Sequence, residues 1–90
     1  MLITGRAHAG ETHSSFIMRN MINDLTWQGD QYEYLLNNFI IKFIPMINVD
    51  GVVIGNSRSS LIGLDLNRRW TNPSPLLHPE VYFIKELMQK

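Results

Sequence analysis

The feature that most constrains the fold is a strand, a helix and a second strand that follow one another in the first half of the chain. Residues 2–4 are apolar or β-branched and run into a glycine, and residues 39–44 form an almost unbroken apolar run that ends at Pro45. Between them, apolar side chains recur at helical spacing from Phe16 to Leu25. This order predicts a βαβ unit with two parallel strands, so the expected fold class is α/β.

The remaining element boundaries come from local signals. Thr12 and Ser14 are candidate N-caps of the first helix, and a weaker helical turn is expected over residues 32–36. Residues 48–75 are rich in Asn, Gly, Ser, Asp and Pro, a composition that predicts loops and tight turns. Apolar residues at helical spacing over 79–88, opened by a proline, predict a C-terminal helix.

Length and composition limit the possible functions. A chain of 90 residues makes one domain at most, and the strand pattern that begins at the second residue predicts a domain entered partway. Eight basic and eight acidic residues balance, which argues against nucleic acid or an anionic membrane as partner. There is no cysteine, no apolar stretch near the ~20 residues of a membrane span and no signal-peptide pattern. We therefore expect a cytoplasmic protein.

The predicted topology brings two polar segments together. Parallel strands present their C-terminal ends at one edge of the sheet, where open α/β sheets bind ligands. The loop from His8 to Glu11 leaves the first strand at that edge, and the loops from Asn48 to Arg68 leave the second. We therefore expect the two segments to share one site.

His8 and Glu11 are candidate metal ligands. Imidazole and carboxylate three residues apart around Gly10 can converge on one ion, and zinc accepts both donors. The alternative is a surface histidine beside a first-turn glutamate that complements the helix dipole. A catalytic zinc usually has three protein ligands, and the third is not evident here, since His13 and His78 are both poor candidates.

Arg58, Asn67 and Arg68 are candidates for binding an anion such as a substrate C-terminus. Guanidinium groups pair bidentately with carboxylates, and an amide adds a donor and an acceptor. In the alternative, Arg68 and Arg69 lie on a solvated loop, Asp65 pairs with one of them, and Asn67 makes a turn.

Taken together, these segments resemble the zinc metallocarboxypeptidase family, and within it the cytosolic carboxypeptidase branch. Members carry R-x-H-P-G-E-T, P-M-x-N-P-D-G-V, N-x-R, D-L-N-R-x-W and a helix-opening H-P, in that order. The counterparts here are Arg6 to Thr12, Pro45 to Val52, Asn56 to Arg58, Asp65 to Trp70, and His78-Pro79. Ala9 and Val49 stand where the pattern has prolines, which puts the rigidity of those loops in question.

The resemblance implies a fold and a set of roles. The fold would be part of a three-layer, carboxypeptidase-like domain of the phosphorylase/hydrolase type, with a mostly parallel sheet. His8 and Glu11 would be the first two Zn²⁺ ligands, and Arg58 would steady the developing oxyanion. Asn67 and Arg68 would bind the substrate's terminal carboxylate. The third ligand, a histidine, and the general base, a glutamate, have no counterpart among these residues.

The sequence thus predicts residues 1–90 to be the N-terminal portion of a single zinc-dependent metallocarboxypeptidase domain, inactive by itself. Such an enzyme hydrolyses residues from the C-termini of proteins or peptides, and the resemblance makes acidic tails such as those of tubulin a candidate substrate. Two alternatives stay open. One is a non-catalytic remnant that binds peptide carboxylates, and the other is a truncated gene product.

Overall fold

A computed structural model describes residues 1–90. The elements follow in the order β1 (Leu2–Thr4), α1 (Thr12–Trp27), η1 (Gly29–Tyr32), α2 (Glu33–Asn38), β2 (Lys42–Ile44), α3 (Val49–Ile54), η2 (Leu66–Arg68) and α4 (Pro79–Gln89). The η elements are single 3-10 turns.

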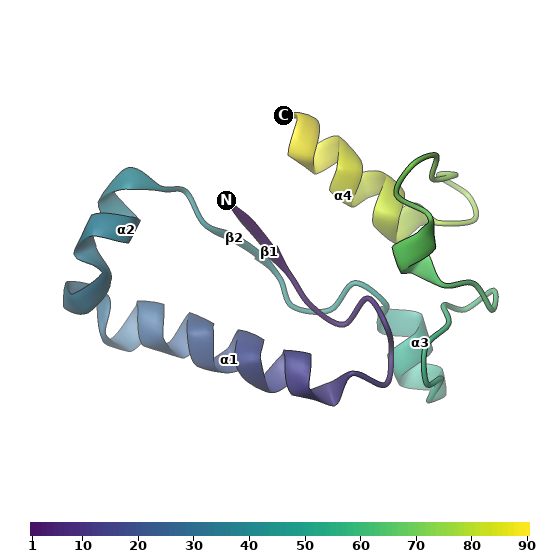
Figure 1. The fold of residues 1–90 in the computed structure, drawn as a ribbon, viewed down its shortest axis with the longest axis horizontal. Helices are drawn as coiled ribbons and strands as arrows, with labels where there is room; N and C mark the ends of the chain where they lie inside the picture. Colours follow the sequence, from purple (N-terminus) through teal and green to yellow (C-terminus); the bar gives the residue numbers. More distant parts are fainter.

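β1 and β2 form the expected βαβ unit. They pair in parallel, with Leu2 opposite Lys42 and Thr4 opposite Ile44, and α1 makes the crossover between them. Figure 1 shows the strand pair running between α1 on one side and α4 on the other, which makes three layers. The α/β prediction is therefore confirmed, with a sheet of two strands.

The core lies on the α4 side of the strands. Val81 and Ile84 of α4 are buried against Ile47 and against Leu66 of η2. Leu2 of β1 is among the half-buried residues that pack onto this cluster. The core therefore fixes η2, which carries two predicted site residues, relative to the sheet.

The second strand is shorter than the predicted run of residues 39–44, because β1 offers backbone partners only as far as Met1. The amino group of Met1 still donates to the carbonyl of Ile40 at 2.7 Å.

The predicted N-caps of α1 are wrong. Glu11 holds the cap position, where its side chain makes no capping hydrogen bond, and Thr12 is already helical. Ser14 lies in the first turn of the helix, and its hydroxyl accepts the backbone N–H of Arg6 at 3.1 Å. The expected turn over residues 32–36 is present as the end of η1 and the start of α2.

The loop prediction for residues 48–75 is wrong at α3. The side chain of Asn48 caps this helix by accepting the backbone N–H of Gly51, and Gly55 ends it in the left-handed conformation at φ 89°. A good cap at each end therefore outweighs the low helix propensity of the glycine and valines between them.

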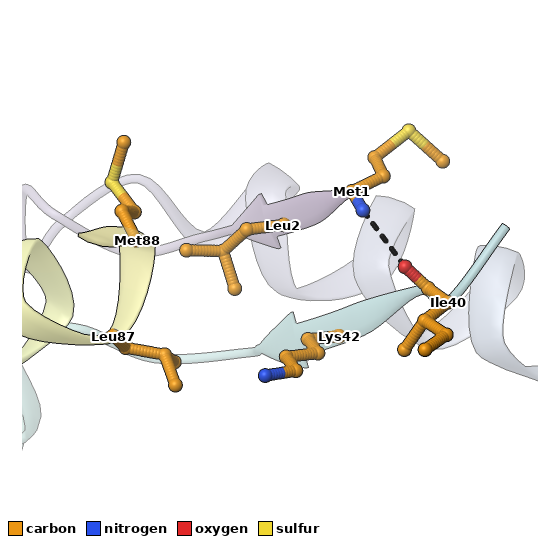
Figure 2. Close-up of a pocket in the computed structure, with 6 residues that line it drawn as sticks. All are labelled: Met1, Leu2, Ile40, Lys42, Leu87 and Met88. Carbon is orange, nitrogen blue, oxygen red and sulfur yellow. Dashed lines mark hydrogen bonds between the residues drawn. The ribbon is translucent and has the colours of Figure 1, made fainter. Parts of the chain in front are cut away.

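The molecule is flat, with extents of 43 × 29 × 15 Å and a radius of gyration of 14.7 Å, against about 12 Å for a compact chain of this length. Large apolar side chains stay exposed on α1, α3 and α4, including Phe16, Val53 and Phe83. A pocket of about 380 Å³ opens between the strands and the end of α4. Figure 2 shows its lining residues, Met1, Leu2, Ile40, Lys42, Leu87 and Met88. Apolar faces of the helices and strands are thus left uncovered.

None of the helices combines the length and apolar character that crossing a bilayer requires.

Candidate metal and carboxylate site

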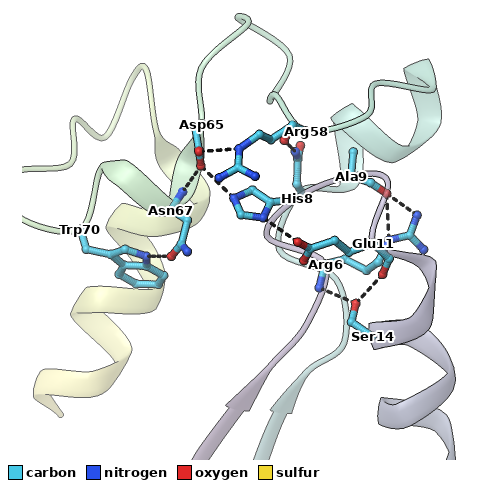
Figure 3. Close-up of polar contacts among 10 residues, drawn as sticks. Arg6, His8, Ala9, Glu11, Ser14, Arg58, Asp65, Asn67 and Trp70 are labelled. Atoms are coloured by element: carbon cyan, nitrogen blue, oxygen red, sulfur yellow. Dashed lines mark hydrogen bonds and ion pairs between the residues drawn. The ribbon is translucent and has the colours of Figure 1, made fainter.

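The two predicted segments meet beyond the C-terminal ends of β1 and β2, as the topology requires (Figure 3). His8 and Glu11 lie in the loop from β1 to α1, which we call the metal loop (residues 6–11). Arg58 follows α3, and Asp65 precedes η2. The structure therefore brings residues that are 57 positions apart in sequence into hydrogen-bonding contact.

Gly10 is the point of closest approach between the two segments. Its backbone N–H donates to the carbonyl of Ser57 at 2.7 Å. A β-carbon at this position would lie 2.6 Å from the same oxygen, closer than real contacts allow. Only glycine lets the metal loop rest directly on the segment that carries Arg58.

The imidazole of His8 is held at both ring nitrogens. Nδ1 lies 2.9 Å from Oε1 of Glu11, and Nε2 lies 3.0 Å from Oδ1 of Asp65. The residue is only 8% exposed, so the ring has little freedom to rotate. Nδ1 consequently faces the carboxylate of Glu11, which gives two metal-type donors side by side.

Asp65 joins the two halves of the site, a role that the sequence analysis missed. One carboxylate oxygen contacts His8 and accepts the backbone N–H of Asn67 at 2.9 Å, while the other accepts Nε of Arg58 at 2.8 Å. The alternative interpretation, in which Asp65 pairs with Arg68 or Arg69, is therefore wrong on this point. One chemical signal could have identified this role of Asp65. A metal-binding histidine usually donates the N–H of its second ring nitrogen to a carboxylate or carbonyl.

This network keeps both carboxylates ionised. The hydrogen bond from His8 is the main cause that lowers the pKa of Glu11, with smaller contributions from the charges of His8, His13 and Arg58. For Asp65, desolvation is the largest influence and raises the pKa, but the hydrogen bonds from Arg58, His8 and the backbone of Asn67 together lower it. Both groups are thus anionic at neutral pH.

The anion-binding candidates are only partly brought together. Oδ1 of Asn67 accepts the indole N–H of Trp70 at 2.9 Å, which leaves the amide NH₂ as the free donor. Nε of Arg58 is occupied by Asp65, while its Nη groups have no partner in the chain. Arg68 is exposed and its guanidinium makes no hydrogen bond or ion pair.

Asn48, fully buried, positions the Arg58 segment. Its amide donates to the carbonyl of Ser59 at 3.0 Å and, at 3.4 Å, to that of Arg58. Its backbone N–H donates to the carbonyl of Arg6 at 3.0 Å. One residue therefore connects the metal loop, through its backbone, with α3 and the segment that carries Arg58, through its side chain.

Neither of the other histidines joins this network. His13 is exposed on the first turn of α1. His78 is buried at the start of α4, where Nδ1 accepts the backbone N–H of Ser74 at 3.0 Å. No three His, Cys, Asp or Glu side chains are grouped so that they could hold a metal ion. The pockets also lie elsewhere, since none is lined by His8, Glu11, Arg58 or Asn67.

Comparison with known proteins now adds a family. The sequence profile of the zinc carboxypeptidases matches residues 1–80. The chain belongs to the zinc carboxypeptidase family. Cytosolic carboxypeptidase 6 of Mus musculus is 46% identical over 90 residues, which is 100% of this chain and 17% of that protein. Cytosolic carboxypeptidase 1 of Homo sapiens is 43% identical over 89 residues, or 99% of this chain and 7% of that protein.

The fold agrees with this assignment. The crystal structure of a Shewanella denitrificans protein named as a carboxypeptidase A superposes with a TM-score of 0.93 at 34% identity. It covers 98% of this chain and 24% of that chain. This zinc carboxypeptidase chain therefore corresponds to less than a quarter of the length of these relatives.

Proposed function

We propose that this chain supplies one half of a zinc metallocarboxypeptidase active site in the cytoplasm. The observation that carries the proposal is the pair formed by Nδ1 of His8 and Oε1 of Glu11, 2.9 Å apart in a loop of a zinc carboxypeptidase chain. The reaction would be hydrolysis of the last peptide bond of a protein or peptide.

The geometry of the pair fits zinc. Zn–N and Zn–O distances near 2.0–2.2 Å and a tetrahedral angle place two ligand atoms roughly 3.3 Å apart. The two donors need to separate by only about 0.4 Å to reach that spacing, judged from their 2.9 Å contact. Asp65 already orients the ring from Nε2, the arrangement that tunes metal-bound histidines in other proteins.

When bound, zinc would polarise the scissile carbonyl and activate a water. The residues of this chain would do the rest of the positioning. Free Nη groups make Arg58 suited to the developing oxyanion, and the free amide NH₂ of Asn67 suits a terminal carboxylate. Arg68, exposed and unpaired, would turn toward the same carboxylate. A third zinc ligand and a general base would come from residues outside this chain.

An acidic C-terminal tail, such as that of tubulin, is the substrate that we propose. Arg58 and Arg68 are exposed, and neither has a partner for its Nη groups. These cations are compatible with an acidic peptide. The rival function is a chain that binds such a carboxylate through the same residues and hydrolyses nothing.

A chimera tests the proposal. The 90 residues replace the aligned segment of mouse cytosolic carboxypeptidase 6, which matches this chain along its whole length. Zinc content and release of glutamate from a peptide with an acidic C-terminus are then measured. We expect zinc retention and activity, both lost in His8→Ala and Glu11→Ala.

The control and the arginine variants separate the two candidate functions. Arg69→Ala is the matched control, since it removes an exposed arginine beside Arg68 with no proposed role. Arg68→Ala should raise KM through loss of a contact worth roughly 1.5 to 3 kcal/mol. A chimera that binds zinc and peptide but never releases glutamate would favour the rival. Zinc retention that survives His8→Ala would contradict the proposed ligands.

A further inference from the structure

Arg6, the first residue of the metal loop, has an unusual backbone. Its φ is +53°, and it is the only residue other than glycine with a positive φ in this structure. Such a conformation is disfavoured for a residue with a long side chain and persists only where the surroundings impose it. The position lies two residues before His8, at the start of the loop.

The guanidinium of Arg6 folds back over this loop. Nε donates to the carbonyl of Ala9 at 3.0 Å, Nη2 donates to the same oxygen, and Nη1 donates to the hydroxyl of Ser15 at 3.0 Å. Figure 3 shows this fork closing on Ala9. No carboxylate pairs with Arg6. Its hydrogen-bonding capacity is therefore used on the loop itself and on α1.

The backbone of Arg6 is held from two more directions. Its N–H donates to the hydroxyl of Ser14 at 3.1 Å, and its carbonyl accepts the N–H of Asn48 at 3.0 Å. Asn48 also holds the carbonyls of Arg58 and Ser59. Arg6 thus connects the metal loop to α1 on one side and to the Arg58 segment on the other.

We propose that Arg6 is the positioning residue of the metal loop, whose guanidinium clamps the Ala9 carbonyl and so fixes the angle between His8 and Glu11. Ala9 stands where the family pattern has a proline, whose ring would fix φ between the two donors. In this chain the Arg6 clamp is the restraint on that stretch of the loop. The inference rests on the proposed function in one respect, namely that the ion bound by the metal loop is zinc.

Arg6→Gly is the informative variant, because glycine adopts a positive φ without strain, so the substitution removes the clamp without forcing the backbone out of its conformation. The assay uses the full 90-residue chain labelled with ¹⁵N. Without metal, exchange protection of the Gly10 amide, which bonds Ser57, should fall at least tenfold. Zinc titration followed by the His8 resonances should show a dissociation constant raised 10- to 100-fold, the usual effect of removing a residue that supports a metal ligand.

Rescue separates positioning from general stability. The N–H of Ala9 donates no backbone hydrogen bond, so Ala9→Pro removes none, and adding it to Arg6→Gly should restore both Gly10 protection and zinc affinity. Arg19→Gln, a change to an exposed arginine on α1, should alter neither. If Gly10 protection and zinc affinity are unchanged in Arg6→Gly, Arg6 is not the positioning residue. In a further outcome the wild-type chain binds no zinc, but Arg6→Gly still lowers the protection of the Gly10 amide. That result would support the clamp and contradict the proposed function.

Discussion

Replacing Asn48 should destabilise the chain more than any other single amide substitution. The residue is fully buried, and its side chain accepts the N–H of Gly51 at 3.0 Å while it donates to the carbonyl of Ser59 at 3.0 Å. Loss of a helix cap costs about 0.5–2 kcal/mol. The Ser59 carbonyl would keep the amide of Asn56 as a donor at 3.2 Å, so losing the hydrogen bond from Asn48 costs a further ~0.5–1.5 kcal/mol. Asn48→Ala should therefore lower the free energy of unfolding by about 1–3.5 kcal/mol.

Asn48→Asp gives a sharper test, because it preserves shape and the capping oxygen. The second carboxylate oxygen would then face the carbonyl of Ser59, which now accepts a hydrogen bond at 3.0 Å. Two acceptors at that distance repel, so at neutral pH this variant should be at least as unstable as Asn48→Ala.

Urea denaturation followed by far-UV circular dichroism measures both effects. With a slope of roughly 1–2 kcal/mol/M, Asn48→Ala should lower the urea midpoint by about 1–2 M. Asn23→Ala, a change to an exposed amide on α1 that makes no side-chain hydrogen bond, should stay within about 0.5 kcal/mol of wild type. If Asn48→Asp unfolds at the wild-type midpoint, Asn48 does not organise the site through the Ser59 carbonyl.

Four further outcomes are expected. Gly10→Ala should weaken zinc binding about tenfold in calorimetric titrations, because its β-carbon would lie 2.6 Å from the Ser57 carbonyl, whereas Gly29→Ala, with nothing nearer than 3.9 Å, should not; equal affinities would refute the close approach. The folded-state pKa values of Glu11 and Asp65 are lowered. Their contribution to stability is therefore complete above about pH 5 and is lost as the pH falls through about 4 and below. A melting temperature that rises on acidification would contradict this direction of the pH dependence. The 90-residue chain should bind zinc with much less than the ~10 kcal/mol of a complete structural site, and tight one-to-one binding would mean that the ligands are elsewhere. Expressed alone, the chain should self-associate as its concentration rises, since many large apolar side chains are exposed; sedimentation as a monomer at every concentration would show that its faces need no cover.

The meeting of the two polar segments was predictable from the sequence. Apolar periodicity identified the strands and the helix between them, and the parallel arrangement of a βαβ unit then placed the loop of His8 and the loop of Arg58 at one edge. The proximity of His8 and Glu11 followed from their spacing. These inferences succeeded because they depend on chain connectivity, which leaves few alternatives.

The rest depended on information that residue types do not carry. Nothing in the sequence distinguishes the carboxylate of Asp65, which reaches across to His8, from one that pairs with a neighbouring arginine. The left-handed backbone of Arg6 belongs to a residue type that rarely adopts it. α3 was missed because its caps, Asn48 and Gly55, flank residues with low helix propensity. In each case either the structure depends on a tertiary contact, or the local propensity of the residues favours a different conformation.

The contact between His8 and Asp65 also sets an order of events in folding. It closes a loop of 57 residues, whereas the hydrogen bonds of α1 and α4 join residues within one turn of each other. Local helices form in about a microsecond, while closing long loops must wait until enough of the chain has been organised to offset the lost entropy. The imidazole environment of His8 should therefore become native only in the last kinetic phase. Time-resolved quenching or exchange at this histidine would report completion of the whole fold.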